Sequence, residues 1–326
     1  MRSDRYGVRE AEPLDRVTAE QPRLTTQIGR LSMKNPVMVA SGTFGYGPEY
    51  DGLVDMSRLG AVVVKGISPW AHHGNETPRT VEVTSGLINA IGLQNPGFEG
   101  FCEKYLPFWE RVDVPLIVNI WGRTLQDYGD VAGMFEQVPR VDALELNISC
   151  PNIKEGGIAF GTKLEMAREV VSLVREKTTK PLITKLSPNV SDIAAFARAV
   201  EDAGSDAISL INSMPAMKID IKRRRPVLAN VTGGLTGPCI RPIAVKLVWE
   251  AAQAVRIPII GMGGIEKLED ALEFFMAGAR AVAVGTANFY DPSFAPGLPG
   301  MIADYLSREG LPSMDAIVGA ALPSRA

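Results

Sequence analysis

The chain has 326 residues, of which 46% are hydrophobic and 22% are charged, and this composition excludes disordered and fibrous proteins. Its 34 basic and 37 acidic side chains give a net charge of −3, so no overall positive field is available to hold nucleic acid. The length fits two average domains or one large α/β barrel.

The N-terminal segment is charged and contains no apolar stretch of signal-peptide length. We expect residues 1–23 to form a flexible N-terminal extension and residues 24–326 to form a single domain. The chain's 3 cysteines, Cys102, Cys150 and Cys239, lie far apart and form no Cys-x-x-Cys pair. This pattern argues against a disulfide framework or an iron–sulfur cluster and favours a reducing compartment, so we expect a cytoplasmic protein without a membrane span.

Short runs rich in β-branched residues recur along the chain, each followed by a turn signal and a helical pattern. This alternation predicts an α/β fold, a (β/α)₈ TIM barrel, with an open doubly wound sheet as the alternative. The expected strands are Pro36–Ser41, Ala61–Lys65, Pro115–Ile120, Ala143–Ile148, Pro181–Leu186, Asp206–Ile211, Ile257–Met262 and Arg280–Gly285. Helical periodicity is clearest over Thr162–Lys177, Ser191–Ala203, Ile240–Val255 and Lys267–Ala277.

Three further segments surround these units. Leu24–Met33 alternates around Ile28-Gly29-Arg30 and predicts a hairpin that plugs the bottom of the barrel. Two insertions, Gly66–Arg111 and Ser213–Arg256, begin at the carboxyl ends of the second and sixth strands. Because active sites of such barrels lie at this end, we expect the site where these ends and loops meet.

The residues at the strand ends are lysines, amides and glycines. Gly263-Gly264 and Gly285-Thr286 follow the last two strands, where barrels commonly bind phosphate through backbone N–H groups. Tight turns would explain either glycine turn alone. Amide side chains offer both donors and acceptors and suit a planar heterocycle, although each could separately serve a turn or a cap. They are Asn89, Asn119, Asn147, Asn152 and Asn212.

Lys65 and Lys185 end strands that look buried, so each needs an anion. A bound carboxylate, phosphate or reduced flavin would serve, and a salt bridge to a barrel carboxylate is the structural alternative. Cys150 is the best candidate for proton transfer, because His72 and His73 are adjacent in a loop and expected to be exposed. We expect no metal site. The basic run Lys222–Arg225 predicts a solvated loop, with anion steering as the alternative.

Three long motifs resemble the class 1B dihydroorotate dehydrogenases, catalytic subunit, and the resemblance covers Thr25–Ser307. They are Gly86–Gly97 (GLINAIGLQNPG), Asn147–Asn152 (NISCPN) and Asn230–Gly237 (NVTGGLTG). The resemblance implies an FMN-containing barrel that oxidises (S)-dihydroorotate to orotate in pyrimidine (UMP) biosynthesis. It also implies a homodimer core and an electron-transfer subunit that carries FAD and a [2Fe–2S] cluster and passes electrons to NAD.

The resemblance also assigns residue roles. Cys150 is the base that takes a proton from ring carbon 5 while a hydride leaves carbon 6 for the flavin, and Lys185 stabilises reduced flavin. Substrate contacts fall on Lys65, Asn89, Ile91, Gly92, Leu93, Asn147, Asn212 and Ser213. FMN contacts fall on Ser41, Lys65, Gly66, Asn119, Asn147, Lys185, Ile211, Gly237, Gly263, Gly264, Gly285 and Thr286.

Other functions remain open on the sequence. A fumarate-linked class 1A enzyme or a dihydropyrimidine dehydrogenase-like enzyme would use a similar barrel. A sugar-phosphate lyase or isomerase is a different class, favoured only by the glycine turns after the last two strands. A non-catalytic binding barrel is the remaining alternative.

Overall fold

The computed structural model describes residues 22–149 and 161–323. Its centre is a closed barrel of parallel strands, in the order β3-β4-β9-β10-β11-β12-β17-β18. The strands are β3 (Val37–Val39), β4 (Ala61–Ile67), β9 (Leu116–Ile120), β10 (Ala143–Asn147), β11 (Leu182–Lys185), β12 (Ala207–Leu210), β17 (Ile259–Met262) and β18 (Ala281–Val284). The predicted (β/α)₈ barrel is thereby confirmed, and the open sheet is excluded.

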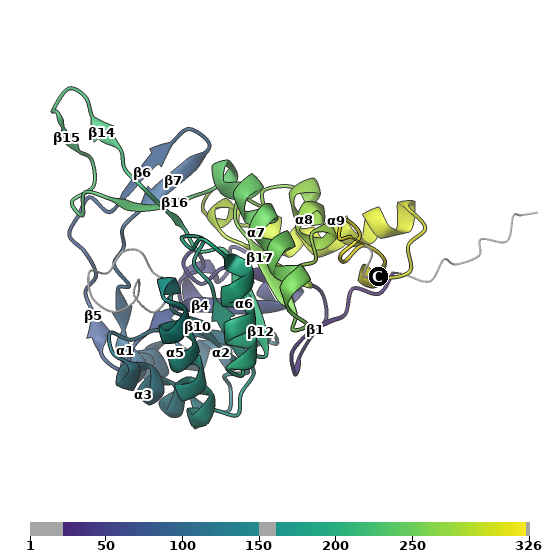
Figure 1. The fold of residues 1–326 in the computed structure, drawn as a ribbon, viewed down its shortest axis with the longest axis horizontal. Helices are drawn as coiled ribbons and strands as arrows, with labels where there is room; N and C mark the ends of the chain where they lie inside the picture. Colours follow the sequence, from purple (N-terminus) through teal and green to yellow (C-terminus); the bar gives the residue numbers. More distant parts are fainter. Residues whose placement is uncertain (1–21, 150–160, 324–326) are drawn as a thin grey trace, which may run out of the picture.

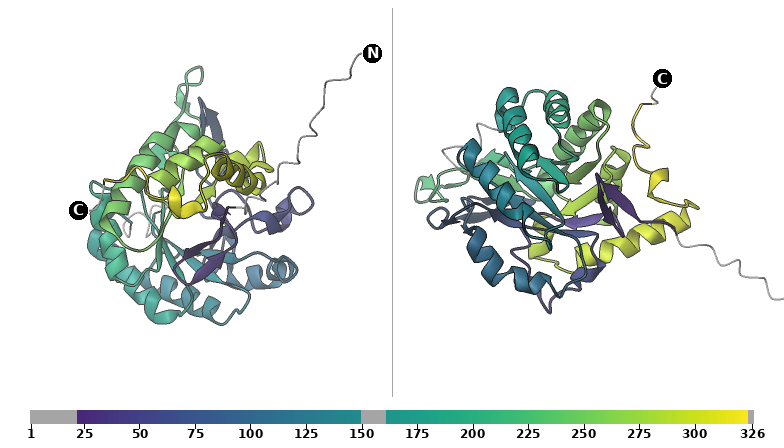
Figure 2. Two further views of the ribbon diagram at one scale, coloured as in Figure 1. Left: turned by 90° about the vertical axis from the view of Figure 1, so that its right-hand side faces the viewer. Right: turned by 90° about the horizontal axis from the view of Figure 1, so that it is seen from below.

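Helices surround the barrel (Figure 2) and follow most of its strands in sequence. They are α1 (Gly97–Lys104), α2 (Leu106–Trp109), α3 (Leu125–Glu136), α5 (Leu164–Lys177), α6 (Ile193–Asp202), α7 (Arg241–Ala254), α8 (Leu268–Met276) and α9 (Phe294–Arg308). Each long helix turns an apolar stripe to the strands; in α5 the buried stripe is Ala167, Val170, Val171 and Val174. Within the described ranges, no helix has the length and apolar character needed to cross a membrane.

The first barrel unit departs from the predicted alternation. Two 3₁₀ turns, η1 (Pro48–Tyr50) and η2 (Met56–Arg58), follow β3 where the pattern predicted a helix. Gly45 and Gly47 adopt positive φ of 56° and 112°, and Pro48 follows directly. Glycines in this conformation and a proline cannot continue an α-helix, so the segment folds as turns.

The predicted hairpin at the bottom of the barrel is confirmed. β1 (Thr26–Ile28) pairs with β2 (Leu31–Met33) in antiparallel fashion. Ile28, Leu31 and Met33 are buried against the inward side chains of the barrel, in a cluster that is separate from the core under the helices. The inward residues of that cluster are Met38, Ala61, Val63, Ile117, Ala143, Ile183, Ala207, Ile260, Met262, Ala281 and Ala283.

The two insertions fold together into an antiparallel sheet, in the order β13-β16-β7-β6. Its strands are β6 (Thr80–Val83) and β7 (Gly86–Asn89) from the first insertion, and β13 (Met214–Ala216) and β16 (Gly233–Thr236) from the second. Short pairs flank it, β5 (Ala71–His72) with β8 (Asn95–Pro96) and β14 (Ile219–Asp220) with β15 (Arg225–Pro226). Figure 1 shows the β14–β15 hairpin projecting at the upper left and β1 at the lower edge of the molecule, well away from the insertion sheet.

Glu136 links the end of α3 to the segment that follows α5. Its carboxylate accepts hydrogen bonds from the Thr178 hydroxyl at 2.5 Å, the Thr179 hydroxyl at 2.6 Å and the Thr179 N–H at 3.0 Å. Desolvation alone would raise the pKa of Glu136, but these hydrogen bonds lower it from 4.5 to about 2.

We therefore expect the free energy of unfolding to fall as the pH falls from 4.5 towards 2, because the unfolded chain binds the Glu136 proton first. Glu136→Gln should lower stability by about 1 kcal/mol at pH 7 and flatten this acid dependence. Urea unfolding across this range measures both effects, with the exposed Glu309→Gln as control. Unchanged acid dependence in Glu136→Gln would contradict the assignment.

Candidate active site

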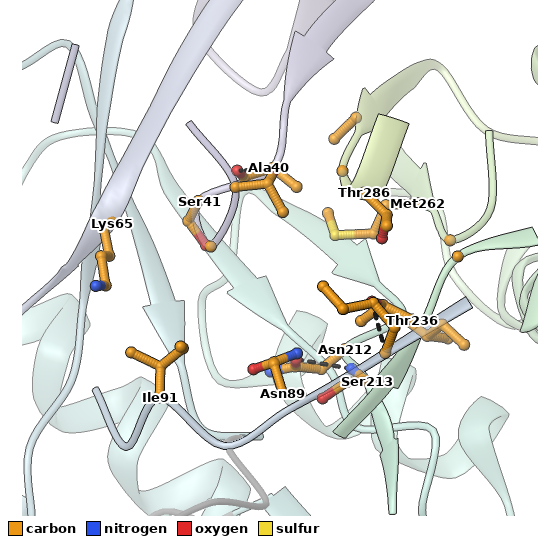
Figure 3. Close-up of a pocket in the computed structure, with 18 of the residues that line it drawn as sticks. Ala40, Ser41, Lys65, Asn89, Ile91, Asn212, Ser213, Thr236, Met262 and Thr286 are labelled. Atoms are coloured by element: carbon orange, nitrogen blue, oxygen red, sulfur yellow. Dashed lines mark hydrogen bonds between the residues drawn. The ribbon is translucent and has the colours of Figure 1, made fainter. Parts of the chain in front are cut away.

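A cavity of about 280 Å³ opens at the carboxyl ends of the barrel strands. Barrel residues form its floor, and β6, β7 and β16 of the insertion sheet add Thr80, Leu87, Asn89 and Thr236 to its walls. Figure 3 shows Lys65 and Thr236 on opposite sides of the cavity, with Asn89 and Asn212 between them. The two ends of the lining thus come from segments far apart in the sequence.

Every predicted site residue that the structure describes lines this one cavity. Cys150 and Asn152 lie outside the described residues. The lining contains Ser41, Lys65, Gly66, Asn89, Ile91, Gly92, Leu93, Asn119, Asn147, Lys185, Ile211, Asn212, Ser213, Gly237, Gly263, Gly264, Gly285 and Thr286. The structure also adds lining residues that the sequence did not single out, among them Thr43, Thr80, Thr236, Met262 and Phe289.

The polar floor is built from the last inward residues of the barrel strands. Successive inward positions of a strand lie two residues apart. Asn119 and Lys185 stand two residues beyond Ile117 and Ile183, which belong to the apolar cluster at the bottom of the barrel. The Asn147 amide lies 3.5 Å from Asn119 Oδ1 and donates to it. The inward residues of β9 and β11 are therefore apolar at one position and polar at the next inward position, two residues further along.

Glu145 is the polar residue that the sequence interpretation missed. It lies between Ala143 and Asn147 on the inward face of β10 and is 1% exposed. Its Oε1 accepts a hydrogen bond of 2.6 Å from Asn119 Nδ2, and its Oε2 accepts one of 2.9 Å from the Ser209 hydroxyl. The signal was available, because a carboxylate between the apolar residues Leu144 and Leu146 of a buried strand must have a buried partner.

The two lysines of the cavity differ in their surroundings. Lys185 Nζ lies 3.8 Å from Glu145 Oε1 and 3.5 Å from the Ser41 hydroxyl, so the salt bridge that the sequence left as an alternative is present. Burial lowers the pKa of Lys65, the nearby Arg79 lowers it further, and Glu49 opposes both effects. Both side chains bring positive charge to one cavity.

A glycine turn follows β17 at the opposite wall. Gly264 has φ +74°, and a Cβ at this position would lie 2.8 Å from the Gly237 carbonyl oxygen. Arg241 fixes the turn from behind: its Nη1 lies 2.6 Å from Asp270 Oδ1 and donates to the Gly264 carbonyl at 3.5 Å. A side chain at this position would clash, so the turn requires glycine, and the backbone of Gly263 and Gly264 lines the cavity here. Exposed backbone N–H groups of such turns commonly bind phosphate.

The segment that leads towards Cys150 begins at the cavity. The Ser149 N–H and hydroxyl both donate to Asn147 Oδ1 at 3.3 Å, and Asn212 Nδ2 donates to the Ser149 hydroxyl at 2.8 Å. Tyr128 fixes the same strand end through a hydrogen bond of 2.9 Å to the Asn147 carbonyl. The ends of β10 and β12 are therefore tied together at the cavity.

The histidines and the basic run lie outside this cavity. His73 is exposed as predicted, but His72 is half-buried, with its ring 5.5 Å from that of Trp121. Burial lowers the pKa of His72, and Arg123 lowers it further. Lys222–Arg225 is exposed on the β14–β15 hairpin, as predicted for a solvated loop. In the described part of the chain, no cluster of three or more His, Cys, Asp or Glu side chains could hold a metal ion.

These features define the kind of ligand that the cavity fits. Amides and hydroxyls on the floor and side offer both donors and acceptors, the Lys65 ammonium favours an anion, and glycine backbone lines part of one wall. This combination suits a planar heterocycle together with a carboxylate or phosphate group.

Comparison with known proteins gives consistent similarities. Residues 23–306 match the family profile described as dihydroorotate dehydrogenase. The catalytic subunit of dihydroorotate dehydrogenase B (NAD(+)) from Geotalea daltonii is 52% identical over 300 residues, which is 92% of this chain and 98% of that protein. The same subunits from Citrifermentans bemidjiense and Geobacter sulfurreducens are each 51% identical over 301 residues, covering 92% of this chain and 99% of each relative.

The glycine turn gives a direct test of the cavity wall. We expect Gly264→Ala to lower the free energy of unfolding by about 1–3 kcal/mol, because it combines positive φ with a clash against the Gly237 carbonyl. Gly300→Ala is the matched control: this helical glycine in α9 has open space around its Cβ position, so alanine should stabilise by about 0.5–1 kcal/mol. Urea unfolding of both variants without ligand measures the contrast, and equal effects would contradict it.

Proposed function

The chain belongs to the dihydroorotate dehydrogenase family, and on this premise we propose that it oxidises (S)-dihydroorotate to orotate as the catalytic subunit of a class 1B enzyme. The observation that carries the proposal is the single cavity that gathers the amides, both lysines and the glycine turns at one end of the barrel. The sugar-phosphate alternative rested on the glycine turns alone and does not account for the floor of amides.

The cavity fits FMN as the cofactor. A Cβ at Gly66 would lie 2.7 Å from Asn119 Oδ1, so a side chain there would fill the space beside the floor amides. Gly237, Gly263 and Gly264 line the cavity at the end of β17 without side chains. FMN, when bound, supplies the acceptor for the hydride that leaves carbon 6 of the substrate. Lys185 and Asn119 would hold it at the floor, and the turns at Gly264 and Gly285 would hold its phosphate.

The chain's own residues bind and deprotonate the substrate in this proposal. Lys65 holds the carboxylate of dihydroorotate by charge, and Asn89, Asn147 and Asn212 orient its ring through amide hydrogen bonds. Cys150 takes the proton from ring carbon 5; this assignment rests on the NISCPN motif, because Cys150 lies outside the described residues. Closing the site against water helps this weak carbon acid to lose its proton.

The electrons have to leave the chain after each turnover. We infer a homodimer core with an electron-transfer subunit that carries FAD and a [2Fe–2S] cluster and reduces NAD. The relatives are named as NAD(+) catalytic subunits, which supports a separate partner. The 3 cysteines of this chain are too few for a cluster of its own. They also support placing the reaction in the cytoplasm.

The proposal is tested by the absorption spectrum of the purified chain. We expect a flavin spectrum that bleaches on anaerobic addition of dihydroorotate. Re-oxidation is then compared with fumarate and with NAD, each in the presence and absence of the candidate partner subunit. Re-oxidation by fumarate without a partner would favour a class 1A enzyme, and a colourless protein that takes up no FMN would contradict the proposal.

Cys150→Ala tests the base. We expect this variant to bind FMN normally and to reduce it at least about 10²-fold more slowly with dihydroorotate, because the proton at carbon 5 loses its acceptor. Stopped-flow measurement of flavin bleaching isolates this step from re-oxidation. Cys102→Ala is the control, since Cys102 is a half-buried packing residue in α1. Normal bleaching in Cys150→Ala would refute the assignment.

Lys65 gives the site a pH dependence. Burial, with Arg79, lowers the pKa of Lys65, so its ammonium loses a proton at lower pH than an exposed lysine does. We expect the KM for dihydroorotate to rise as the pH is raised through that lowered pKa, because the substrate carboxylate loses its counter-charge. Steady-state kinetics between about pH 6 and pH 10 measure the rise. Lys65→Met should show a high KM that no longer changes with pH in this way.

A further inference from the structure

Glu145 is a buried carboxylate that the proposed mechanism does not use. It stands on the inward face of β10, one layer below Asn147, and its side chain is 2% exposed. The cavity above it is lined by Asn119, Asn147 and Lys185. Glu145 therefore lies beneath the cavity floor.

Three other barrel strands, the two neighbours of β10 and the strand beyond β11, direct polar groups at this carboxylate. Asn119 of β9 donates to Oε1 at 2.6 Å, Ser209 of β12 donates to Oε2 at 2.9 Å, and Lys185 of β11 places its Nζ 3.8 Å from Oε1. The pairing register sets Glu145 opposite Asn119, and Lys185 opposite Ser209. Each carboxylate oxygen thus has a hydrogen-bond donor, and the negative charge has a cation beside it.

The first consequence concerns the amide of Asn119. An ionised carboxylate only accepts hydrogen bonds, so it requires the NH₂ group of Asn119 to face it. The amide oxygen must then point away, towards Asn147 Nδ2 at 3.5 Å and the open space beside Gly66. The Glu145 carboxylate therefore orients the Asn119 amide so that its oxygen, a hydrogen-bond acceptor, faces the cavity.

The second consequence concerns the ammonium of Lys185. This group lies between the carboxylate and the Ser41 hydroxyl, at 3.8 Å and 3.5 Å. A buried cation without a counter-charge is strongly unfavourable. The carboxylate therefore holds the ammonium charge at the cavity floor, and the pair as a whole is neutral.

We propose that Glu145 is a positioning residue for the reaction: from below the cavity, it fixes the amide of Asn119 and the ammonium of Lys185 in the orientations that the cofactor meets. The inference deepens the proposed function and rests on it for the identity of the cofactor. The pairing itself can be tested without any ligand.

The first experiment is a double-mutant cycle on the ligand-free chain, in which urea unfolding measures the stability of each variant. Glu145→Gln and Lys185→Met should each lower the unfolding midpoint, because each leaves one buried charge unpaired. The double variant should unfold at a higher midpoint than either single variant, since no buried charge remains unpaired. A double variant that is no more stable than the less stable single variant would overturn the pairing, whether or not Glu145→Gln folds alone.

The second experiment measures FMN affinity by quenching of flavin fluorescence on titration with the apoprotein. Glu145→Gln should bind FMN at least about tenfold more weakly than the wild type. The loss of FMN affinity that the same substitution causes in the Lys185→Met background should be clearly smaller. Thr184→Val is the matched control, because Thr184 is a fully buried polar residue next to Lys185 whose hydroxyl bonds Ser205. It should leave affinity within about twofold of the wild type.

The outcomes separate the inference from the proposed function. Equal losses of FMN affinity for Glu145→Gln in the wild-type and Lys185→Met backgrounds would overturn the claim that Glu145 acts through Lys185. A similar loss of affinity in Thr184→Val would do the same. A wild-type chain that binds no FMN would contradict the proposed cofactor, while the unfolding cycle would still decide whether Glu145 holds Lys185.

Discussion

The two-residue repeat of the barrel strands is the constraint on which the site depends. Inward positions alternate along each strand, so the barrel interior is filled in layers. The lower layers contain Ile117, Ile183 and the apolar side chains of the β1–β2 hairpin. The next inward positions, Asn119 and Lys185, carry polar groups that have to satisfy one another because little water reaches them. A one-residue shift in the register of β9 would replace the Asn119 amide at the floor with the apolar side chain of Val118 or Ile120.

The insertion sheet forms the part of the cavity wall that the barrel strands do not supply. β7 belongs to the insertion after the second barrel strand, and β16 belongs to the insertion after the sixth. The two strands nevertheless pair with each other, with Asn89 opposite Gly234. Asn89 Nδ2 also donates to the Gly234 carbonyl at 3.2 Å. This pairing brings the GLINAIGLQNPG and NVTGGLTG motifs together above the floor, which explains why both long motifs belong to one site.

The sequence predicted the features that depend on local pattern. The barrel strands follow from β-branched runs, the hairpin plug from alternation around Gly29, and the cavity lining from the residue types at strand ends. It could not predict the β7–β16 pairing, which joins segments far apart in the chain, nor the turns that replace a helix after β3. Glu145 was not predicted because it lies in the middle of β10, whereas the residue types that indicated the site stand at the ends of the strands.

The hairpin also bears on how a ligand reaches the cavity. Ile28, Leu31 and Met33 pack against the apolar side chains that fill the lower part of the barrel, so among the described residues they add an apolar layer at the end away from the site. The carboxyl ends of the strands, where the cavity opens, therefore remain as the route for ligand exchange.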